Sequence, residues 1–150
     1  MSDASAKSNH YSGRFNFAID EKRRTQVPSK WRSEDPEAEY MVVLWQHPVG
    51  QCLRVLDRDG REKLERRFEE MPKDDPHRDA LRRRYGGDSE LVKLHSGRIT
   101  LPSWLAEEAG LKAEATLVGV FNCFEIWNPE LFEKSRTIDF EATRNFVLSI

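Results

Sequence analysis

The 150-residue chain contains 24 lysine and arginine residues against 26 aspartate and glutamate residues, so its formal net charge is −2. This balance gives no overall attraction to nucleic acid, and any such binding must come from a local basic patch. No apolar run reaches the roughly 20 residues that a membrane helix needs, and the polar start lacks the apolar stretch of a signal peptide. We therefore expect one compact, cytoplasmic protein with no membrane partner.

The first half of the chain has the pattern of short strands separated by turns. Phe15, Phe17 and Ile19 alternate with Asn16 and Ala18, which is the period of a strand with one buried face. A short strand then ends at Pro28, which favours a short helix directly after it. Two apolar segments separated by turn residues predict a β-hairpin, with strands at residues 40–45 and 52–56.

The middle of the chain changes to the spacing of a helix. Apolar residues recur three or four positions apart over residues 64–71, between charged residues, and Pro72 follows them. This pattern predicts an amphipathic helix over residues 57–71. A second helix is predicted over residues 76–85, ended by the glycines at 86 and 87.

The second half of the chain repeats the first half in the same order. The sequence RITLPS at residues 98–103 matches RTQVPS at 24–29, and CFEI at 123–126 matches CLRV at 52–55. Two matches in the same order, at nearly equal offsets, predict a tandem duplication of one small β-rich unit. The elements predicted here are strands at residues 91–94, 98–101, 115–120 and 123–127 and a helix at 103–109 that ends at Gly110.

A duplicated unit of hairpin, R-x-x-[VL]-P-S, short helix and second hairpin, joined by a helical linker, resembles the MraZ family. The resemblance covers about residues 11–139 and includes LVGV at 117–120 and EIW at 125–127. It implies an α+β fold in which two pseudo-two-fold related, AbrB-like swapped-hairpin units share a β-barrel, with connecting and C-terminal helices. The implied organisation is a disordered tail at residues 1–10, repeat 1 at 11–57, a helical linker at 58–87, repeat 2 at 88–130 and a C-terminal segment at 131–150.

The resemblance also implies a sequence-specific transcriptional regulator that binds double-stranded DNA. MraZ proteins typically act on the division and cell-wall gene cluster and assemble into rings. We therefore expect tandem DNA repeats as the target, a ring-like homo-oligomer, a nucleoid-associated location and no cofactor. The alternative is an oligomeric scaffold or protein-interaction module that keeps this fold with a degenerate DNA-binding surface. An AbrB-like antitoxin is a weaker alternative, because such proteins usually carry one copy of the unit.

The hallmark of the family is D-x-x-x-R in both repeats, usually with glycine just before the arginine. The first copy keeps Asp20 and Arg24 but carries Arg23 at the glycine position, so Arg23 must tolerate strain or the turn must differ. One interpretation of Arg24 is a DNA contact, because a guanidinium can bind guanine O6 and N7 or a phosphate. The other interpretation is an ordinary solvated residue of the strand. We predict that Arg24 contacts DNA and that Lys22 and Arg23 strengthen phosphate binding.

The second copy keeps Gly97 and Arg98 but carries Leu94 at the aspartate position. A carboxylate can orient a guanidinium across a tight turn, so we expect Arg98 to lack its orienting carboxylate. The predicted DNA-binding residues are Arg24, Arg98, Lys22, Arg23, Arg14, Lys93 and His95, supported by Asp20 and Gly97.

The reactive side chains do not form a pattern typical of an enzyme. Cys52 and Cys123 stand alone among apolar residues, which favours small buried side chains over a disulfide or a metal site. The four histidines show no ligand spacing, and the carboxylates form no recognisable catalytic pair. We therefore predict no catalytic residues and no metal. Apolar residues at 138–150 are expected to pack either on the core or on a neighbouring subunit.

Overall fold

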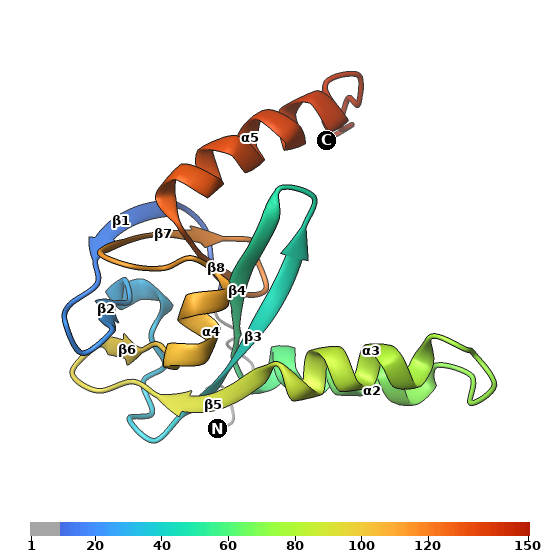
Figure 1. Cartoon of the computed structure of the whole chain (residues 1–150), viewed down its shortest axis with the longest axis horizontal. Coiled ribbons are helices and arrows are strands. Elements are labelled where there is room, and N and C mark those ends of the chain that lie inside the picture. The colour runs from blue at the N-terminus through green and yellow to red at the C-terminus, as the bar shows by residue number, and fades with distance from the viewer. Residues whose placement is uncertain (1–9) are drawn as a thin grey trace.

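The computed structural model describes residues 10–150, so the predicted tail at 1–10 lies outside the described residues except for His10. The described chain is a mixed α+β structure with a mostly antiparallel sheet and four α-helices (Figure 1). The elements in chain order are β1 (Arg14–Ala18), β2 (Arg24–Gln26), the 3₁₀ helix η1 (Ser29–Trp31), β3 (Glu39–His47), β4 (Gly50–Leu56), α2 (Arg58–Glu70), α3 (Arg78–Gly87), β5 (Ser89–Lys93), β6 (Arg98–Thr100), α4 (Ser103–Glu108), β7 (Glu114–Gly119), β8 (Phe124–Trp127) and α5 (Pro129–Thr143).

Six of the strands form one antiparallel sheet in the order β1-β7-β8-β4-β3-β5. The remaining strands, β2 and β6, pair with each other as a separate two-stranded ribbon. The two edge strands of the sheet, β1 and β5, are not paired with one another, so the predicted β-barrel is wrong. The physical reason is that β2 and β6 have only three residues each and form a ladder with one another but not with β1 or β5, so they do not join the two edges of the sheet.

The main core lies between the sheet and the ribbon, together with η1 and α4. Trp31 of η1 is fully buried and stacks on Phe124 of β8, with 5.0 Å between the ring centroids. The ribbon contributes Ile99, and α4 contributes Leu105; neither side chain is exposed. Because the ribbon is anchored by buried side chains, its two turns are held in a defined position at the edge of the molecule.

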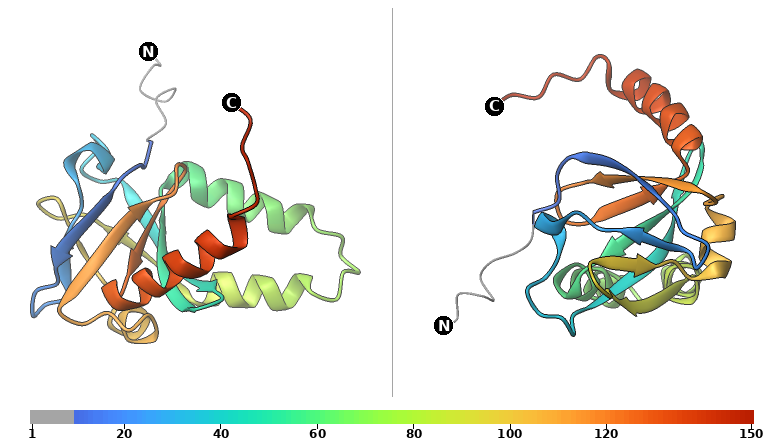
Figure 2. Two further views of the ribbon diagram at one scale, coloured as in Figure 1. Left: turned by 90° about the horizontal axis from the view of Figure 1, so that it is seen from above. Right: turned by 90° about the vertical axis from the view of Figure 1, so that its left-hand side faces the viewer.

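A smaller cluster occupies the opposite face of the sheet, because side chains alternate along a strand. It contains Met41 and Val43 of β3, and the helices α2 and α3 cover it with Leu64 and Tyr85. These two helices project from the sheet as an arm, and the β1–β2 and β5–β6 turns lie at the other end of the molecule (Figures 1 and 2).

The predicted end of the second linker helix is wrong. We expected Gly86 and Gly87 to stop it, but α3 includes both glycines, and the hydrogen bond from Asp88 N to Arg84 O (3.2 Å) closes its last turn. A β-carbon at either glycine would meet no heavy atom within 4 Å. The local sequence therefore marks the end of this helix one or two residues too early, as is common for exposed helix ends.

The last helix, α5, begins where the Asn128 side chain accepts a hydrogen bond from Leu131 N (3.0 Å). Ser135 is the one buried residue of α5. The apolar side chains near its end and beyond remain exposed, with Phe140 at 73% and Phe146 at 71%. In this structure, therefore, Phe140 and Phe146 do not pack on the core of the same chain.

Candidate nucleic-acid interface

The two arginine-bearing turns lie next to each other because β2 and β6 pair in an antiparallel register. Thr25 stands opposite Ile99, and both side chains are buried, so the ribbon is symmetrical about this pair. Arg24 precedes Thr25 on one strand, and Arg98 precedes Ile99 on the other. The pairing therefore relates the two arginines by an approximate two-fold axis.

Asp20 binds both of these arginines. Its Oδ2 accepts a hydrogen bond from Arg24 Nε (2.8 Å), and Arg98 Nη1 lies 3.6 Å from the same oxygen. Its Oδ1 accepts hydrogen bonds from the backbone N–H groups of Lys22 and Arg24, each at 2.9 Å. The expectation that Arg98 lacks a carboxylate is therefore wrong, because the carboxylate comes from the neighbouring turn.

The electrostatics of this cluster favour an ionised Asp20. Hydrogen bonding from the backbone N–H of Arg24 is the main cause that lowers the pKa of Asp20 below its ordinary value, and the Arg24 side chain adds to this effect. The Arg24 and Arg98 side chains remain 36% and 43% exposed. Each guanidinium is therefore held on one side by a charged carboxylate and is open to a ligand on the other side.

The two turns differ in length by one residue. In the first, Arg23 N donates to Asp20 O (2.9 Å) and Asp20 N donates to Arg24 O (3.0 Å), which encloses residues 21–23. Arg23 itself adopts a φ of +62°, in the left-handed region that glycine prefers. This three-residue loop ends in a left-handed residue, a common hairpin geometry. Arg23 therefore accepts the glycine conformation and does not change the turn.

The second turn is a two-residue loop. His95 N donates to Arg98 O (2.9 Å), and Arg98 N donates to His95 O (3.0 Å). Ser96 and Gly97 between them have φ values of +53° and +73°, as a type I′ turn requires. His95 therefore closes the second turn with its backbone N–H and C=O, as Asp20 closes the first.

Because the two loops differ in length, the structural counterpart of Leu94 is Ile19. Leu94 lies just before the closing residue His95 and packs against the main core, as Ile19 does just before Asp20. The direct comparison of Leu94 with Asp20, which the sequence motif suggests, is wrong. The second turn has His95 where the first has Asp20, and its loop is one residue shorter.

The remaining predicted residues divide into those at the paired turns and those elsewhere. Lys22 and His95 are exposed on the turns. Arg23 is also exposed, and its Nε donates to Leu101 O (3.2 Å). Lys93 makes an ion pair with Glu37 (2.8 Å), and this contact raises the pKa of Lys93 above its ordinary value.

Arg14 is not part of the cluster of arginines. It lies at the start of β1, opposite Val118 of β7, whereas Asp20 follows the other end of β1. Its guanidinium carbon is 5.8 Å from the ring centroid of Phe132 on α5. The structure therefore separates Arg14 from the paired turns by the length of a strand.

Sequence reasoning missed Arg32, whose guanidinium lies on the second turn. Its Nε donates to Val27 O (2.8 Å), and a β-carbon built on Gly97 would lie 2.5 Å from its Cζ atom. Arg32 is half-buried and forms no ion pair with any residue in the range 10–150. No local signal in the sequence could have found this contact, because 64 residues separate the two partners along the chain.

Comparison with known proteins agrees with the resemblance. Residues 95–143 match the family described as "MraZ protein, putative antitoxin-like". A protein of Thermomicrobium roseum named "Transcriptional regulator MraZ" is 34% identical over 119 residues, covering 79% of this chain and 81% of the relative. Proteins with the same name from Hydrogenovibrio crunogenus and Syntrophobacter fumaroxidans are 35% and 30% identical, and the matches cover 79% and 87% of each chain.

The chain belongs to the MraZ family. The MraZ relatives are named as transcriptional regulators and not as enzymes, which confirms the prediction that this chain is not an enzyme. In the part of the MraZ chain that the structure describes, no helix combines the length and the apolar character needed to span a bilayer. Across residues 10–150, no three His, Cys, Asp or Glu side chains gather as a possible metal site.

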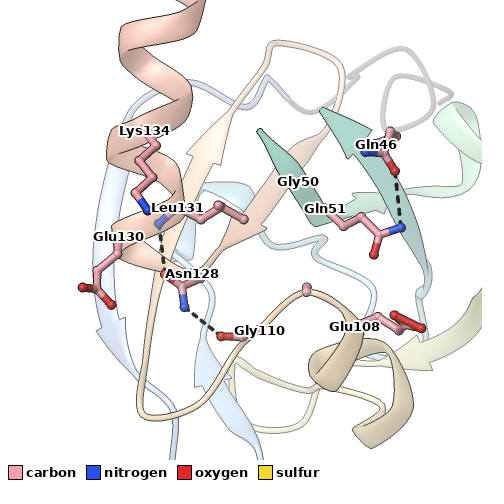
Figure 3. A pocket seen from close by; sticks show the side chains of 10 residues that line it. Gln46, Gly50, Gln51, Glu108, Gly110, Asn128, Glu130, Leu131 and Lys134 are labelled. Carbon is pink, nitrogen blue, oxygen red and sulfur yellow. Dashed lines mark hydrogen bonds between the residues drawn. The ribbon is translucent and has the colours of Figure 1, made fainter. Parts of the chain in front are cut away.

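A pocket of about 630 Å³ in this MraZ chain lies between the β3–β4 hairpin and the start of α5 (Figure 3). Asn128 donates to Gly110 O (2.8 Å) and caps Leu131 N, and Gln51 donates to Gln46 (3.3 Å). These polar groups hold the surrounding elements together. None of the DNA-binding residues predicted from the sequence lines this pocket.

The two cysteines are buried, as the sequence predicts. Burial raises the pKa of the Cys123 thiol to about 11 and also raises the pKa of Cys52. A thiol with a raised pKa is protonated near neutral pH and is a poor nucleophile. Both cysteines therefore act as small apolar residues of the MraZ core.

Proposed function

We propose that this MraZ family member is a sequence-specific transcriptional regulator that binds double-stranded DNA. The observation that carries the proposal is the placement of Arg24 and Arg98 side by side on one carboxylate, Asp20. The name of its relatives supports a role in transcription regulation. The resemblance to the family supports a division and cell-wall gene cluster, carrying tandem DNA repeats, as the target.

The geometry of the arginine pair suits the reading of base edges. A guanidinium addresses O6 and N7 of guanine with two parallel hydrogen bonds, and the major groove is wide enough for a two-stranded ribbon. Arg24 uses its Nε on Asp20, which leaves its Nη groups for a base. The exposed side chains of Lys22 and Arg23 extend from the same turn and would bind phosphates.

Two further features of the proposal concern organisation. We propose that residues 11–57 and 88–130 are AbrB-like swapped-hairpin repeats, joined by the linker at 58–87, and the symmetrical pairing of β2 with β6 supports this. The same proposal assigns residues 131–150 to contacts between subunits. The exposure of Phe140 and Phe146 supports such contacts, because apolar side chains grouped on a surface favour association.

A ring-like homo-oligomer would explain how a small interface reads a long site. One chain presents one pair of arginines, which spans only a few base pairs. Several copies on tandem repeats bind together, because each bound copy raises the effective concentration of the next. A regulator of this kind is expected in the cytoplasm at the nucleoid. The test is light scattering at micromolar concentration. A strictly monomeric protein would contradict the proposal that several joined copies bind the repeats together.

The test is binding to DNA that carries tandem repeats, measured by fluorescence anisotropy over a range of salt concentrations. Arg24→Ala should weaken specific binding by about tenfold or more, because one arginine–guanine contact contributes about 1–3 kcal/mol of discrimination. The matched control is Arg58→Ala, because Arg58 is an exposed arginine of α2 that pairs with Glu62 and lies outside both the turns and residues 131–150. Wild-type protein that binds no DNA near physiological salt would refute the proposal and favour the scaffold alternative.

A further inference from the structure

Beside the central pair of Arg24 and Arg98 lie two further arginines, Arg23 and Arg32. They hold equivalent positions, although they come from different parts of the fold. In the first half, Arg23 O accepts a hydrogen bond from Leu101 N (2.8 Å), and the Arg23 side chain donates from Nε back to Leu101 O (3.2 Å). In the second half, Gly97 O accepts from Val27 N (3.0 Å). The equivalent position in the second half therefore lies beside Gly97 and Val27.

Arg32 occupies that position. Its Nε donates to Val27 O (2.8 Å), as Arg23 Nε does to Leu101 O, and its guanidinium lies where a side chain of Gly97 would begin. Val27 and Leu101 hold equivalent places, each two residues beyond the central residue of its strand. The absence of a side chain at Gly97 thus leaves space for an arginine supplied from the end of η1.

We propose that Arg32 is a DNA phosphate-binding residue and the functional equivalent of Arg23 in the other half of the interface. This inference rests on the proposed function. Arg32 has its Nε engaged by a backbone carbonyl, and no carboxylate among residues 10–150 pairs with its guanidinium. Its Nη groups therefore remain as two charged donors held in a fixed direction, which suits the planar geometry of a phosphate.

The arrangement gives the four arginines two distinct tasks. Arg24 and Arg98 share Asp20 at the centre, whereas Arg23 and Arg32 are each held at the outside by a neutral carbonyl and, among residues 10–150, by no carboxylate. The outer pair thus keeps its full positive charge for the DNA backbone, which runs along both sides of the groove. The inner pair is oriented by a carboxylate, and orientation matters most for base edges.

The experiment compares Arg32→Ala with Arg24→Ala on tandem-repeat DNA and on a scrambled duplex of equal length. Arg32→Ala should weaken binding to both duplexes by the same factor, about tenfold for one charged hydrogen-bonding group. It should also reduce the slope of log affinity against log salt by about 0.9 for each engaged subunit. Arg24→Ala should instead lower the ratio between specific and scrambled DNA.

Two further variants keep the test decisive if Arg32→Ala folds poorly. Arg32→Lys keeps the charge but loses the planar pair of donors, so it should retain the salt slope and lose part of the affinity. Arg23→Gln should reproduce the effect of Arg32→Ala, because the two arginines are equivalent. The control is again Arg58→Ala, which should change neither the affinity nor the slope.

The outcomes separate this inference from the proposed function. If Arg24→Ala weakens specific binding while Arg32→Ala leaves both affinity and salt slope unchanged, the role of Arg32 is refuted and the regulator stands. If Arg32→Ala changes only the specific-to-scrambled ratio, Arg32 contacts bases and the phosphate assignment is wrong. If the wild-type protein binds neither duplex, the proposed function and this inference fail together.

Discussion

Replacement of Gly97 by alanine tests the contact between the second turn and Arg32. Gly97 has a φ of +73°, and this left-handed conformation costs an L-residue about 1–2 kcal/mol. The new β-carbon would lie 2.5 Å from Arg32 Cζ, so the guanidinium must leave Val27 O, with a loss of about 1 kcal/mol. The lower entropy of unfolded alanine offsets about 0.4–1 kcal/mol, so we expect a net loss of about 2 kcal/mol.

The assay is urea unfolding followed by tryptophan fluorescence at one fixed protein concentration, because association changes apparent stability. Gly86→Ala is the matched control. Gly86 lies inside α3, and a β-carbon there meets nothing within 4 Å. This substitution should therefore raise stability by about 0.5–1 kcal/mol, the ordinary gain for alanine over glycine in a helix. A Gly97→Ala protein with the wild-type midpoint would refute the reasoning.

The same substitution in an Arg32→Ala background separates the two sources of the loss. Without the Arg32 side chain, Gly97→Ala should cost only the backbone strain, because no guanidinium remains to be displaced. A double-mutant cycle should therefore give a coupling of about 1 kcal/mol between the two positions. A coupling near zero would mean that Arg32 moves aside freely and that its place on the turn is not defined by Gly97.

The remaining predictions concern ionisation. Because the pKa of Asp20 is lowered on folding from its ordinary 3.8, its contribution to stability is complete above that pH and is lost as the pH falls through the folded value. Asp20→Asn should flatten the dependence of the urea midpoint on pH below about pH 4, and an unchanged profile would contradict this. Because Cys52 and Cys123 are buried with raised pKa values, neither thiol should react with a disulfide reagent at neutral pH until urea unfolds the chain, and rapid labelling of the native protein would contradict that burial.

Local elements of the fold could be predicted because their signals lie within short stretches of sequence. The β3–β4 hairpin follows from two apolar segments separated by turn residues, and α2 follows from apolar residues at helical spacing. The barrel could not be predicted correctly from the same signals. Closure depends on whether β2 and β6 are long enough to pair with β1 and β5 as well as with each other, and each has only three residues.

The sequence likewise predicts part of the candidate site, and the rest depends on contacts that only the structure shows. The repeat in the sequence predicts that Arg24 and Arg98 hold equivalent places, and the register of β2 with β6 agrees with it. A motif read at constant spacing cannot show that the second turn is one residue shorter than the first, so it aligns Leu94 with Asp20. Only the backbone hydrogen bonds of His95 identify the true counterpart.

The two halves of the candidate interface each place a guanidinium beside the turn, but they do so in different ways. Arg23 places its guanidinium directly from the turn, and it does so in a left-handed conformation that strains a residue with a side chain. In the other half, Gly97 adopts the left-handed conformation without that strain, and Arg32 supplies the guanidinium from the end of η1. A substitution at the turn therefore has opposite effects on backbone strain in the two halves, although both substitutions disturb a cation. Glycine at position 23 relieves strain and removes the Arg23 guanidinium, whereas a side chain at position 97 adds strain and displaces the Arg32 guanidinium.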